Sequence, residues 1–535
     1  MSAISTCRLT VAIIARNAQT LLPGTLATAR MLADEILVVD SSSGDRTAEV
    51  AKACGARVIS RAWDDSFAKA RNVALDHARG EWILWLDAGE QMAPSAAAEL
   101  KKFVHDKADP QKVYLLAITV PPAPGNIAGE QVARVRLVPH TVRWRYVGRV
   151  CERLEPQPEA CGLTLDGLPW RIHRGPRENE SATKVHRARR NLTLVKLDVA
   201  ERGPKPCLLV TQGEALTGLG NHTAAAAAFR QAIRAAAPTS TSQREAYYGL
   251  LTALNHDPAD RQTQINVCVE ALKIFPRDAQ LLCALGGYMQ AQNQLDLSAH
   301  AYRMAAQFGE IEPRTWHVPD IHEIATVCWS LTYQLRANDD AACRVLEEAL
   351  ARNDNAQRVR RHLLDVYIRR DQRKEALAQL DHLPAETPHR EALRGAIRGA
   401  CLAAARNWVP ALAYLQAAHF AGCRDVICLR WLAAALIGSG QRDAALPILH
   451  EWLAIEPRSV EAQKCLEMFA PPVLEAPPVV QPMPSDPPLE ADPRRLRVDV
   501  PEPAANSSVP APRFAGAPTG ASPAAGPSAP PAKGR

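Results

Sequence analysis

The sequence lacks the patterns that mark disulfide-rich, zinc-binding and membrane-spanning proteins. Its 13 cysteines are odd in number and form no Cys-x-x-Cys pair, and the closest two are Cys423 and Cys428. This spacing argues against a disulfide framework or a zinc site and favours reduced cysteines. No apolar run approaches the roughly 18 residues of a membrane-spanning helix, and the N-terminus has no signal-peptide pattern. We therefore expect a soluble, cytoplasmic chain without a transmembrane segment.

The net charge is also small, and aromatic residues are few. The 535 residues carry a formal net charge of +6, and aromatic side chains make up only 5% of them. Arginines and aromatics are not grouped in any recognisable reader module, so we expect no nucleic-acid partner. The hydrophobic residues, 47% of the chain, are rich in Ala and Leu. That bias favours helix packing over a large sheet.

The first part of the chain alternates β-rich runs with amphipathic stretches. Strands are predicted at 8–14, 35–40, 56–60 and 82–86, with helices between them at 18–32, 45–54 and 66–79. This alternation predicts a parallel sheet with helices on both faces. Ligands bind at the carboxyl ends of strands in such sheets. Asp40 and Asp87 both lie at strand ends, so we expect them to converge on one cleft that accepts a diphosphate nucleotide.

The middle of the chain has a helical pattern with an internal repeat. A small residue recurs with an aromatic or Leu four positions later and another small residue three after that, as at Ala225, Phe229 and Ala232. Aligning this signature gives repeat starts near 206, 245, 279, 323, 357, 392 and 426, with spacings of 34 to 44 residues. A 34-residue helix-turn-helix is the tetratricopeptide period. The pattern predicts an all-α, tetratricopeptide-like solenoid.

These patterns divide the chain into four segments. We expect an α/β domain at 1–177, a helical connector at 178–205, about seven repeats at 206–469 and a tail at 470–535. The tail is rich in Pro, Ala, Ser and Gly. Such a composition cannot bury enough apolar surface to offset its chain entropy, so the tail is expected to be disordered.

Polar motifs follow the predicted strands of the first segment. They are Ala-Arg-Asn at 15–17, VVDSSSGDRT at 38–47, WDDSFAKARN at 63–72 and WLDAGE at 85–90. Together they resemble the N-terminal half of family 2 (GT-A fold, Rossmann-like) glycosyltransferases. They are most similar to the bacterial subgroup that joins this domain to tetratricopeptide repeats and includes peptide S-glycosyltransferases.

The resemblance implies roles for single residues. Ala15 and Arg16 would contact the base through the loop backbone, and Asp40 would contact the nucleotide. Asp87 would contact the ribose or a metal ion, and Arg71 would contact phosphate or hold the site together. The implied donor is a UDP- or GDP-sugar with Mg²⁺ or Mn²⁺, cations that take only one or two protein carboxylates beside phosphate oxygens.

The sequence departs from the family pattern in its metal-binding loop. Gly89 stands where the second carboxylate of the D-x-D motif is expected. Glu90 is therefore a candidate metal ligand, although it also matches the trailing Glu of the family motif. His173 resembles a further family position and is a candidate metal or phosphate contact, with a structural role as the alternative.

A second departure lies near the expected catalytic base. In YVGRVCERL, residues 146–154, Cys151 replaces the family's His. An inverting transfer needs a general base beside the acceptor, and Glu152 is the leading candidate. The alternative for Glu152 is a surface carboxylate paired with a nearby arginine. The surrounding arginines, among them Arg134, Arg136 and Arg149, form either a cationic wall for the diphosphate or a solvated strand face.

The function that we predict is an inverting hexosyltransferase. It would move a sugar from a nucleotide-diphosphate donor to a protein, peptide or cell-envelope glycan, with the acceptor or a protein partner docked on the repeats. The alternative is a degenerate transferase domain in a tetratricopeptide scaffold for protein interaction. The losses at Gly89 and Cys151 favour that alternative, whereas the intact nucleotide-side residues favour the enzyme.

Overall fold

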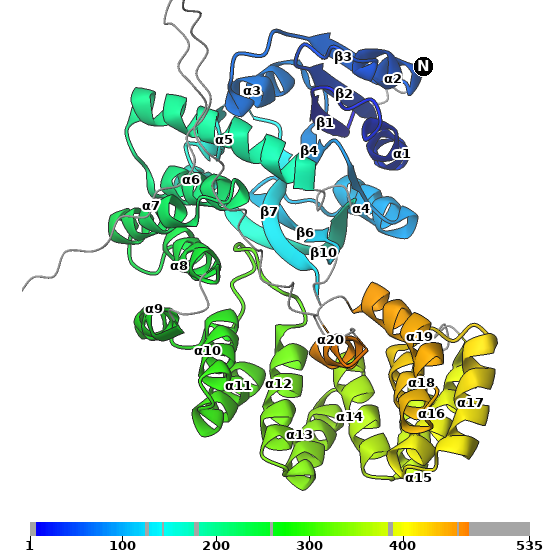
Figure 1. The fold of residues 1–535 in the computed structure, drawn as a ribbon. Coiled ribbons are helices and arrows are strands. Elements are labelled where there is room, and N and C mark those ends of the chain that lie inside the picture. The colour runs from blue at the N-terminus through cyan, green and yellow to red at the C-terminus, as the bar shows by residue number, and fades with distance from the viewer. Residues whose placement is uncertain are drawn as a thin grey trace, which may run out of the picture. The chain divides into compact units, whose positions relative to one another are not determined.

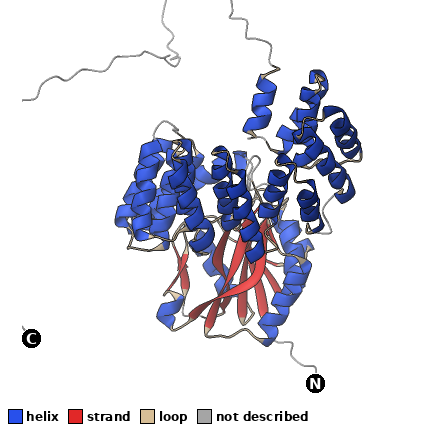
Figure 2. Cartoon of the chain, turned by 90° about the horizontal axis from the view of Figure 1, so that it is seen from below, coloured by secondary structure: helices blue, strands red, loops and turns tan. Residues whose placement is uncertain are grey.

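The computed structural model describes residues 7–122, 128–141, 144–175, 181–256, 261–383, 389–456 and 459–469. The predicted disordered tail at 470–535 lies outside these residues. The described chain begins with a sheet flanked by helices and continues as an array of helices, as Figures 1 and 2 show. An α/β domain followed by an all-α solenoid was the predicted fold class, and it is confirmed. No described helix has the length and apolar character needed to cross a membrane.

The N-terminal domain is built on one eight-stranded sheet. Its order is β3-β2-β1-β4-β7-β6-β10-β5. The strands are β1 Leu9–Ala15, β2 Glu35–Asp40, β3 Arg57–Ser60, β4 Trp82–Asp87, β5 Glu90–Gln91, β6 Lys112–Val120, β7 Glu130–Pro139 and β10 Thr164–Arg174. A separate hairpin is formed by β8 Arg145–Val147 and β9 Arg153–Glu155. The helices are α1 Leu22–Leu32, α2 Thr47–Ala53, α3 Phe67–His77 and α4 Pro94–Asp106, with the short 3₁₀ turn η1 Pro158–Cys161.

The sequence predicts a parallel sheet, but only the first half of the observed sheet is parallel throughout. Strands β3, β2, β1 and β4 run parallel, whereas β7 is antiparallel to both of its neighbours, β4 and β6. The difference arises because strand–helix alternation continues through α4 to β6, whereas no described helix lies between β6 and β7. The reversal places β7 next to β4, so that Arg136 of β7 reaches Asp87 at the carboxyl end of β4.

Two hydrophobic layers cover the faces of this sheet. On one face, Leu22 and Leu26 of α1 pack with Leu100 of α4 against the strands. On the other face, Ala70 and Ala74 of α3 pack with a second cluster of buried strand residues. All five side chains are almost completely removed from solvent, and each buried Leu contributes about 2 kcal/mol of hydrophobic stabilisation. The layers hold the strand ends in a fixed arrangement.

The helical part consists of α5 and a series of helix pairs. The connecting helix is α5 Ser181–Arg202. The pairs are α6 Pro206–Gly218 with α7 His222–Ala235, α8 Thr241–Leu254 with α9 Arg261–Ile274, α10 Ala279–Ala291 with α11 Leu295–Phe308, α12 Ile321–Leu335 with α13 Asp339–Arg352, α14 Gln357–Arg369 with α15 Arg373–Asp381, α16 Arg390–Ala404 with α17 Trp408–Phe420, and α18 Val426–Gly438 with α19 Arg442–Ile455. A final helix, α20, spans Val460–Glu467.

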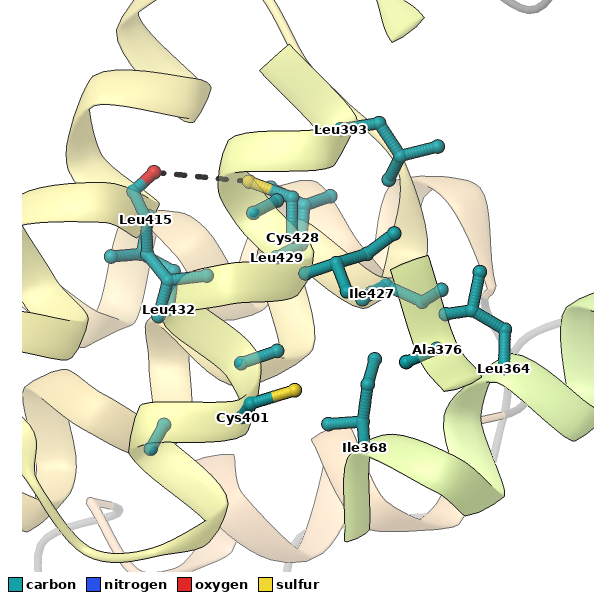
Figure 3. Close-up of a cluster of buried hydrophobic side chains, with 14 of the residues drawn as sticks. Leu364, Ile368, Ala376, Leu393, Cys401, Leu415, Ile427, Cys428, Leu429 and Leu432 are labelled. Atoms are coloured by element: carbon teal, nitrogen blue, oxygen red, sulfur yellow. Dashed lines mark hydrogen bonds between the residues drawn. The ribbon is translucent and has the colours of Figure 1, made fainter. Parts of the chain in front are cut away.

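The repeat signature forms the contacts inside and between the pairs. Phe229 is 1% exposed, and its ring lies against two glycines. A Cβ atom would come within 2.6 Å of the ring at Gly213 and within 2.2 Å at Gly249. The small residues of the signature therefore make room for the large one on the neighbouring helix. Figure 3 shows a cluster of buried Leu, Ile, Ala and Cys side chains in a later part of the array, where the Cys428 thiol points at the carbonyl oxygen of Leu415, 3.8 Å away.

One connection of the array reaches the sheet. Residues 309–320 join α11 to α12, and we call them the α11–α12 loop. His317 and Gln131 of β7 exchange two main-chain hydrogen bonds of 2.8 and 2.9 Å, and the Ala133 amide donates to the carbonyl of Pro313 at 2.6 Å. The loop thus pairs with the part of β7 that extends beyond the residues paired with β4.

Candidate active site

The ends of β1 and β2 hold three of the predicted nucleotide contacts. The carbonyl of Ala15 accepts the Ser41 amide at 2.9 Å, and the Asp40 carboxylate accepts the Ser43 hydroxyl. Asp40 is buried, whereas Arg16 is exposed and lies 5.6 Å from the ring centre of Trp63.

A cavity of about 420 Å³ lies beside the end of β4, and Asp87 lines it. None of Ala15, Arg16 and Asp40 lines this cavity. Because β1 separates β2 from β4, Asp40 and Asp87 belong to strands about 10 Å apart. The two carboxylates therefore occupy the same edge of the sheet but do not share the cavity.

The charged lining of the cavity is mainly basic. Two carboxylates, Asp87 and Glu152, face arginines from α3, β7, β9 and β10. These arginines are Arg71, Arg134, Arg136, Arg153 and Arg174. An excess of guanidinium groups in an enclosed space favours an anionic ligand. The sequence left two roles open for these arginines, a cationic wall for the diphosphate or a solvated strand face. Arg136 fits the cationic wall better, because it is only 5% exposed.

Asp87 is the centre of an ion-pair cluster. Its carboxylate lies 3.2 Å from the guanidinium of Arg136, 3.2 Å from that of Arg174 and 3.5 Å from that of Arg71. Burial opposes ionisation, but the three arginines outweigh it and hold the pKa of Asp87 well below its usual range. The side chain keeps 38% of its surface accessible. Asp87 is therefore a charged carboxylate that still faces the cavity.

Glu90 lies behind Asp87 rather than in the cavity lining. It is 1% exposed, and its carboxylate accepts the Asp87 amide at 2.9 Å, Arg136 at 2.7 Å and Arg174 at 3.0 Å. Burial raises the pKa of Glu90, Arg136 opposes that shift, and the neighbouring Asp87 charge adds to it. These contacts orient the loop and the two arginines.

The backbone conformation at position 89 favours a glycine between Asp87 and Glu90. Its φ of +97° is in the left-handed region that disfavours other residues, and its amide donates to the Thr25 hydroxyl at 2.9 Å. A second aspartate at this position would be strained. The turn that replaces it directs Glu90 to the Asp87 amide.

The predicted base lies on the opposite side of Arg71. Glu152 contacts the Nε of Arg71 through its Oε1 at 2.8 Å, and its side chain is 16% exposed. Arg71 also lies over the rings of Trp85 and Tyr146, 4.8 and 5.4 Å from their centres. Burial raises the pKa of Tyr146 to about 12, so this ring is neutral near pH 7. Arg71 thereby links Glu152 to Asp87 at the floor of the cavity.

Cys151, the residue before Glu152, connects the sheet domain with the helical array. The Cys151 thiol lies 2.7 Å from the Thr211 hydroxyl and 3.6 Å from the carbonyl of Cys207, both on α6. The neighbouring Cys207 side chain and burial raise the pKa of Cys151 well above its usual value, and the Thr211 hydroxyl opposes that shift. The amide of Arg149 donates to the Asp198 carboxylate of α5 at 2.7 Å. Residues 148–152, which we call the Glu152 loop, are thus held by the first two helices of the array.

His173 does not join this cluster. The side chain is exposed, and its Nδ1 lies 2.7 Å from the Thr119 hydroxyl on β6. The next residue, Arg174, contacts Asp87 and Glu90 instead. Within the described part of the chain, no group of three His, Cys, Asp or Glu side chains is placed to hold a metal ion. A divalent cation beside the end of β4 would be held by the Asp87 carboxylate and would need phosphate oxygens from its ligand, because the Glu152 carboxylate is paired with Arg71.

Two residues of the cavity that the argument uses, Arg174 and Trp316, were given no role from the sequence, and Arg136 was named only among arginines with two open roles. Arg174 could have been noticed as the neighbour of His173. Trp316 comes from the α11–α12 loop, 142 residues beyond Arg174. No sequence pattern connects that loop with the sheet.

Comparison with known proteins assigns the N-terminal domain. Residues 10–112 match the model of the family Glycosyl transferase family 2. A protein of Synechococcus elongatus named as TPR repeat-containing is 40% identical over 101 residues, which are 19% of this chain and 24% of that protein. An uncharacterized glycosyltransferase of Rickettsia bellii is 29% identical over 101 residues, 19% of this chain and 34% of that protein. The chain thus spans at most about a third of the length of these relatives.

Solved structures resemble the two parts separately. A tetratricopeptide repeat protein from Parabacteroides merdae aligns with 49% of this chain and 98% of its own at 14% identity, with a TM-score of 0.36. Glucosyl-3-phosphoglycerate synthase from Mycobacterium tuberculosis, in complex with Mn²⁺ and UDP, aligns with 21% of this chain and 43% of its own at 19% identity, with a TM-score of 0.18. Both scores are too low to support an argument, so the family match carries the assignment. The chain therefore joins a glycosyl transferase family 2 domain to a tetratricopeptide-like helical array.

Proposed function

We propose that this chain is an inverting glycosyltransferase that moves a hexose-type sugar from a UDP- or GDP-sugar to a protein, peptide or envelope-glycan acceptor. The observation that carries the proposal is the cavity beside β4. Arg71 there joins Asp87 and Glu152, the two carboxylates that the described residues contribute to the lining, within a basic enclosure. The family 2 match supports glycosyl transfer in general.

The donor would lie along the strand ends. The base and ribose would contact the backbone of Ala15 and Arg16 and the carboxylate of Asp40, which are outside the cavity but at the same edge of the sheet. The diphosphate would enter the cavity, where Arg136 and Arg174 move from Asp87 onto phosphate oxygens. Bidentate guanidinium contacts suit phosphate, and they would stabilise the charge that develops on the leaving group.

A divalent cation, Mg²⁺ or Mn²⁺, would be held by Asp87 together with diphosphate oxygens. One protein carboxylate is sufficient for such a cation when phosphates complete its coordination. Glu90 and His173, the other predicted ligands, would act by orienting Asp87 and by contacting Thr119, because their side chains already have these partners. The cation would help to neutralise the leaving diphosphate.

Glu152 would act as the general base. Its Oε1 is bound by Arg71, and among the described residues no hydrogen bond is recorded for its Oε2. That oxygen would take the proton of the acceptor nucleophile as the nucleophile attacks the anomeric carbon, while the bond to the diphosphate breaks on the opposite face. The reaction balances, since the proton ends on Glu152 and the electron pair on the diphosphate.

Calorimetry with UDP, GDP and their hexose conjugates tests this proposal. We expect binding that strengthens with Mn²⁺, is lost in Asp87→Ala and persists in Glu152→Gln, while Glu152→Gln loses at least about 100-fold in transfer or slow donor hydrolysis. Asp166→Ala, which removes an exposed ion pair with Lys112, is the matched control. Absence of nucleotide binding in the unaltered chain would favour the scaffold alternative, in which the arginine contacts of Asp87 are purely structural.

A further inference from the structure

The α11–α12 loop is fixed at both of its ends. Besides its pairing with β7, its Glu310 exchanges main-chain hydrogen bonds with the connection that precedes α10. Gln280 of α10 holds the middle of the loop, because its amide donates to the Trp316 carbonyl and accepts the Val318 amide, each at 3.1 Å. The loop is therefore a rigid bridge between the repeats and the sheet.

Trp316 stands at the point where two cavities meet. It lines the transferase cavity and packs against the buried core of the sheet domain. It also lines a second cavity, of about 670 Å³, formed mainly by α5, α6, α8 and α10. We call this second cavity the repeat groove. Because Trp316 lines both cavities, a ligand that reaches from one cavity to the other would contact this side chain.

The repeat groove contains a carboxylate without a partner. Glu214 of α6 lines it together with Glu245 of α8 and Glu130 of β7. Among the described residues no hydrogen bond or ion pair is recorded for Glu214, whereas Glu245 lies 3.5 Å from Arg134. Desolvation of the carboxyl group and the like charges of Glu245 and Glu130 raise the pKa of Glu214 to about 7, and Arg134 opposes that shift only in part.

Basic side chains of α5 also line the groove, but they leave this imbalance in place. Lys184 and Arg187 are part of the lining, but these two cations face three carboxylates, Glu130, Glu214 and Glu245. Glu214 is accessible to solvent within the groove, so a cation that enters the groove can pair with this carboxylate and offset its two like-charged neighbours. The ligand that meets this need carries an ammonium or guanidinium group.

We propose that the repeat groove and Trp316 bind a basic polypeptide acceptor, with Trp316 as the specificity-determining contact that guides it into the transferase cavity. This inference rests on the proposed function and narrows its acceptor from three classes to one. Extended polypeptide with Lys or Arg near the modified residue provides both the reach and the positive charge. A neutral glycan offers no cation for Glu214.

Fluorescence anisotropy with two labelled dodecapeptides tests the inference on the full chain. One peptide has four repeats of Gly-Ser-Lys, and the other has four repeats of Gly-Ser-Glu. We expect the first to bind at least about tenfold more tightly at low salt. Trp316→Ala and Glu214→Gln should each weaken its binding by about five- to tenfold, as expected for a central aromatic contact and a charge pair.

Matched controls separate this effect from general damage. Phe420, which is 95% exposed on the distant helix α17, gives the aromatic control Phe420→Ala. Glu391, which is 85% exposed on α16, gives the charge control Glu391→Gln. Both should bind the Lys peptide like the unaltered chain. Because Trp316 packs on the core, Trp316→Phe provides a milder variant that should keep most of the affinity and the melting temperature.

The outcomes are distinguishable from a failure of the proposed function. Equal binding of the two peptides, or equal losses in the control variants, would overturn the inference while UDP binding stays intact. In Trp316→Ala the loss of peptide affinity should exceed any loss of UDP affinity by at least about fivefold, and parallel losses would also overturn it. Peptide binding in a chain that binds no nucleotide would refute the acceptor role and leave a scaffold groove.

Discussion

Removal of the Asp198 carboxylate should loosen the Glu152 loop. Asp198 is completely buried in α5, its Oδ2 accepts the Arg149 amide at 2.7 Å, and its Oδ1 accepts the Arg202 guanidinium at 2.5 Å. In Asp198→Ala the Arg149 amide and the Arg202 cation both lose their partner. A hydrogen bond to a charged group contributes about 1.5–3 kcal/mol, and an unsatisfied buried donor costs a similar amount. We therefore expect local opening of the loop to become easier by about 2–3 kcal/mol.

Hydrogen exchange measured by mass spectrometry on a peptide spanning 145–155 reports this local opening. A decrease of about 2–3 kcal/mol corresponds to exchange that is roughly 30- to 150-fold faster. Because the loop carries Glu152, transfer should fall by at least about tenfold through misplacement of the base. Donor affinity should fall less, since Asp87 and Asp40 lie on other elements.

Asp166→Ala is the control for the same substitution at the surface. Asp166 pairs with Lys112 at 2.9 Å, and both side chains are well exposed. Exposed pairs contribute less than about 1 kcal/mol, so exchange in the 145–155 peptide should stay within about twofold of the unaltered chain. If Asp198→Ala changes exchange by less than threefold, the helices of the array do not hold this loop, and the explanation of its geometry is refuted.

Three further predictions concern the turn after β4, the repeat core and the groove. Gly89→Ala should destabilise the sheet domain by about 1–2 kcal/mol in urea unfolding, because its φ of +97° strains any other residue; an unchanged midpoint would contradict this. Phe229→Ala should cost about 3–5 kcal/mol, because the ring fills the space beside Gly213 and Gly249, and circular dichroism melting would detect the loss. Affinity for the Lys peptide should rise from pH 6 to pH 8, because Glu214, with its pKa raised to about 7 beside Glu245, Glu130 and Arg134, ionises over that range. Because the pKa is raised in the folded chain, the contribution of Glu214 to the free energy of unfolding falls as pH rises from about 4.5 to 7. The stability of Glu214→Gln relative to the unaltered chain should therefore be higher at pH 8 than at pH 5. The same variant should bind the Lys peptide without this pH-dependence.

Local periodicity was sufficient to predict the repeats. The aligned signature predicts starts at 279, 357 and 426, and the helix pairs begin at Ala279, Gln357 and Val426. This agreement arises because each repeat buries its own small and aromatic residues against its neighbours, so the core pattern is local in sequence. The one interval of 44 residues, between 279 and 323, contains the α11–α12 loop. Its extra length could be seen in the sequence, but its partner strand could not.

The candidate site was predictable only where its residues lie at the ends of predicted strands or in family motifs. Asp87, Arg71 and Glu152 were named from such motifs, and the structure brings them into one ion-paired cluster. Arg136 was named only among arginines with two open roles and Arg174 was given none, because both reach Asp87 through the order β4-β7-β6-β10. That order is set by non-local pairing, which leaves no periodic trace in a single sequence. Asp40 illustrates the same limit. It lies at the end of β2, as expected, but it does not line the cavity with Asp87.

The departures from the family pattern have a common physical explanation. Gly89 provides the turn by which Glu90 reaches the Asp87 amide, and Cys151 takes the position of the family's His while its thiol contacts Thr211 of α6. An imidazole at 151 would be larger than the thiol and would have to displace α6, because the side chain is enclosed between the Glu152 loop and the array. Without that His, Glu152 must be held by other residues. Arg71 binds the Glu152 carboxylate, and Asp198 binds the Arg149 amide of the same loop. Helices α5 and α6 thus hold the loop of the candidate site, and Cys151→His should separate them from the Glu152 loop rather than restore a metal ligand.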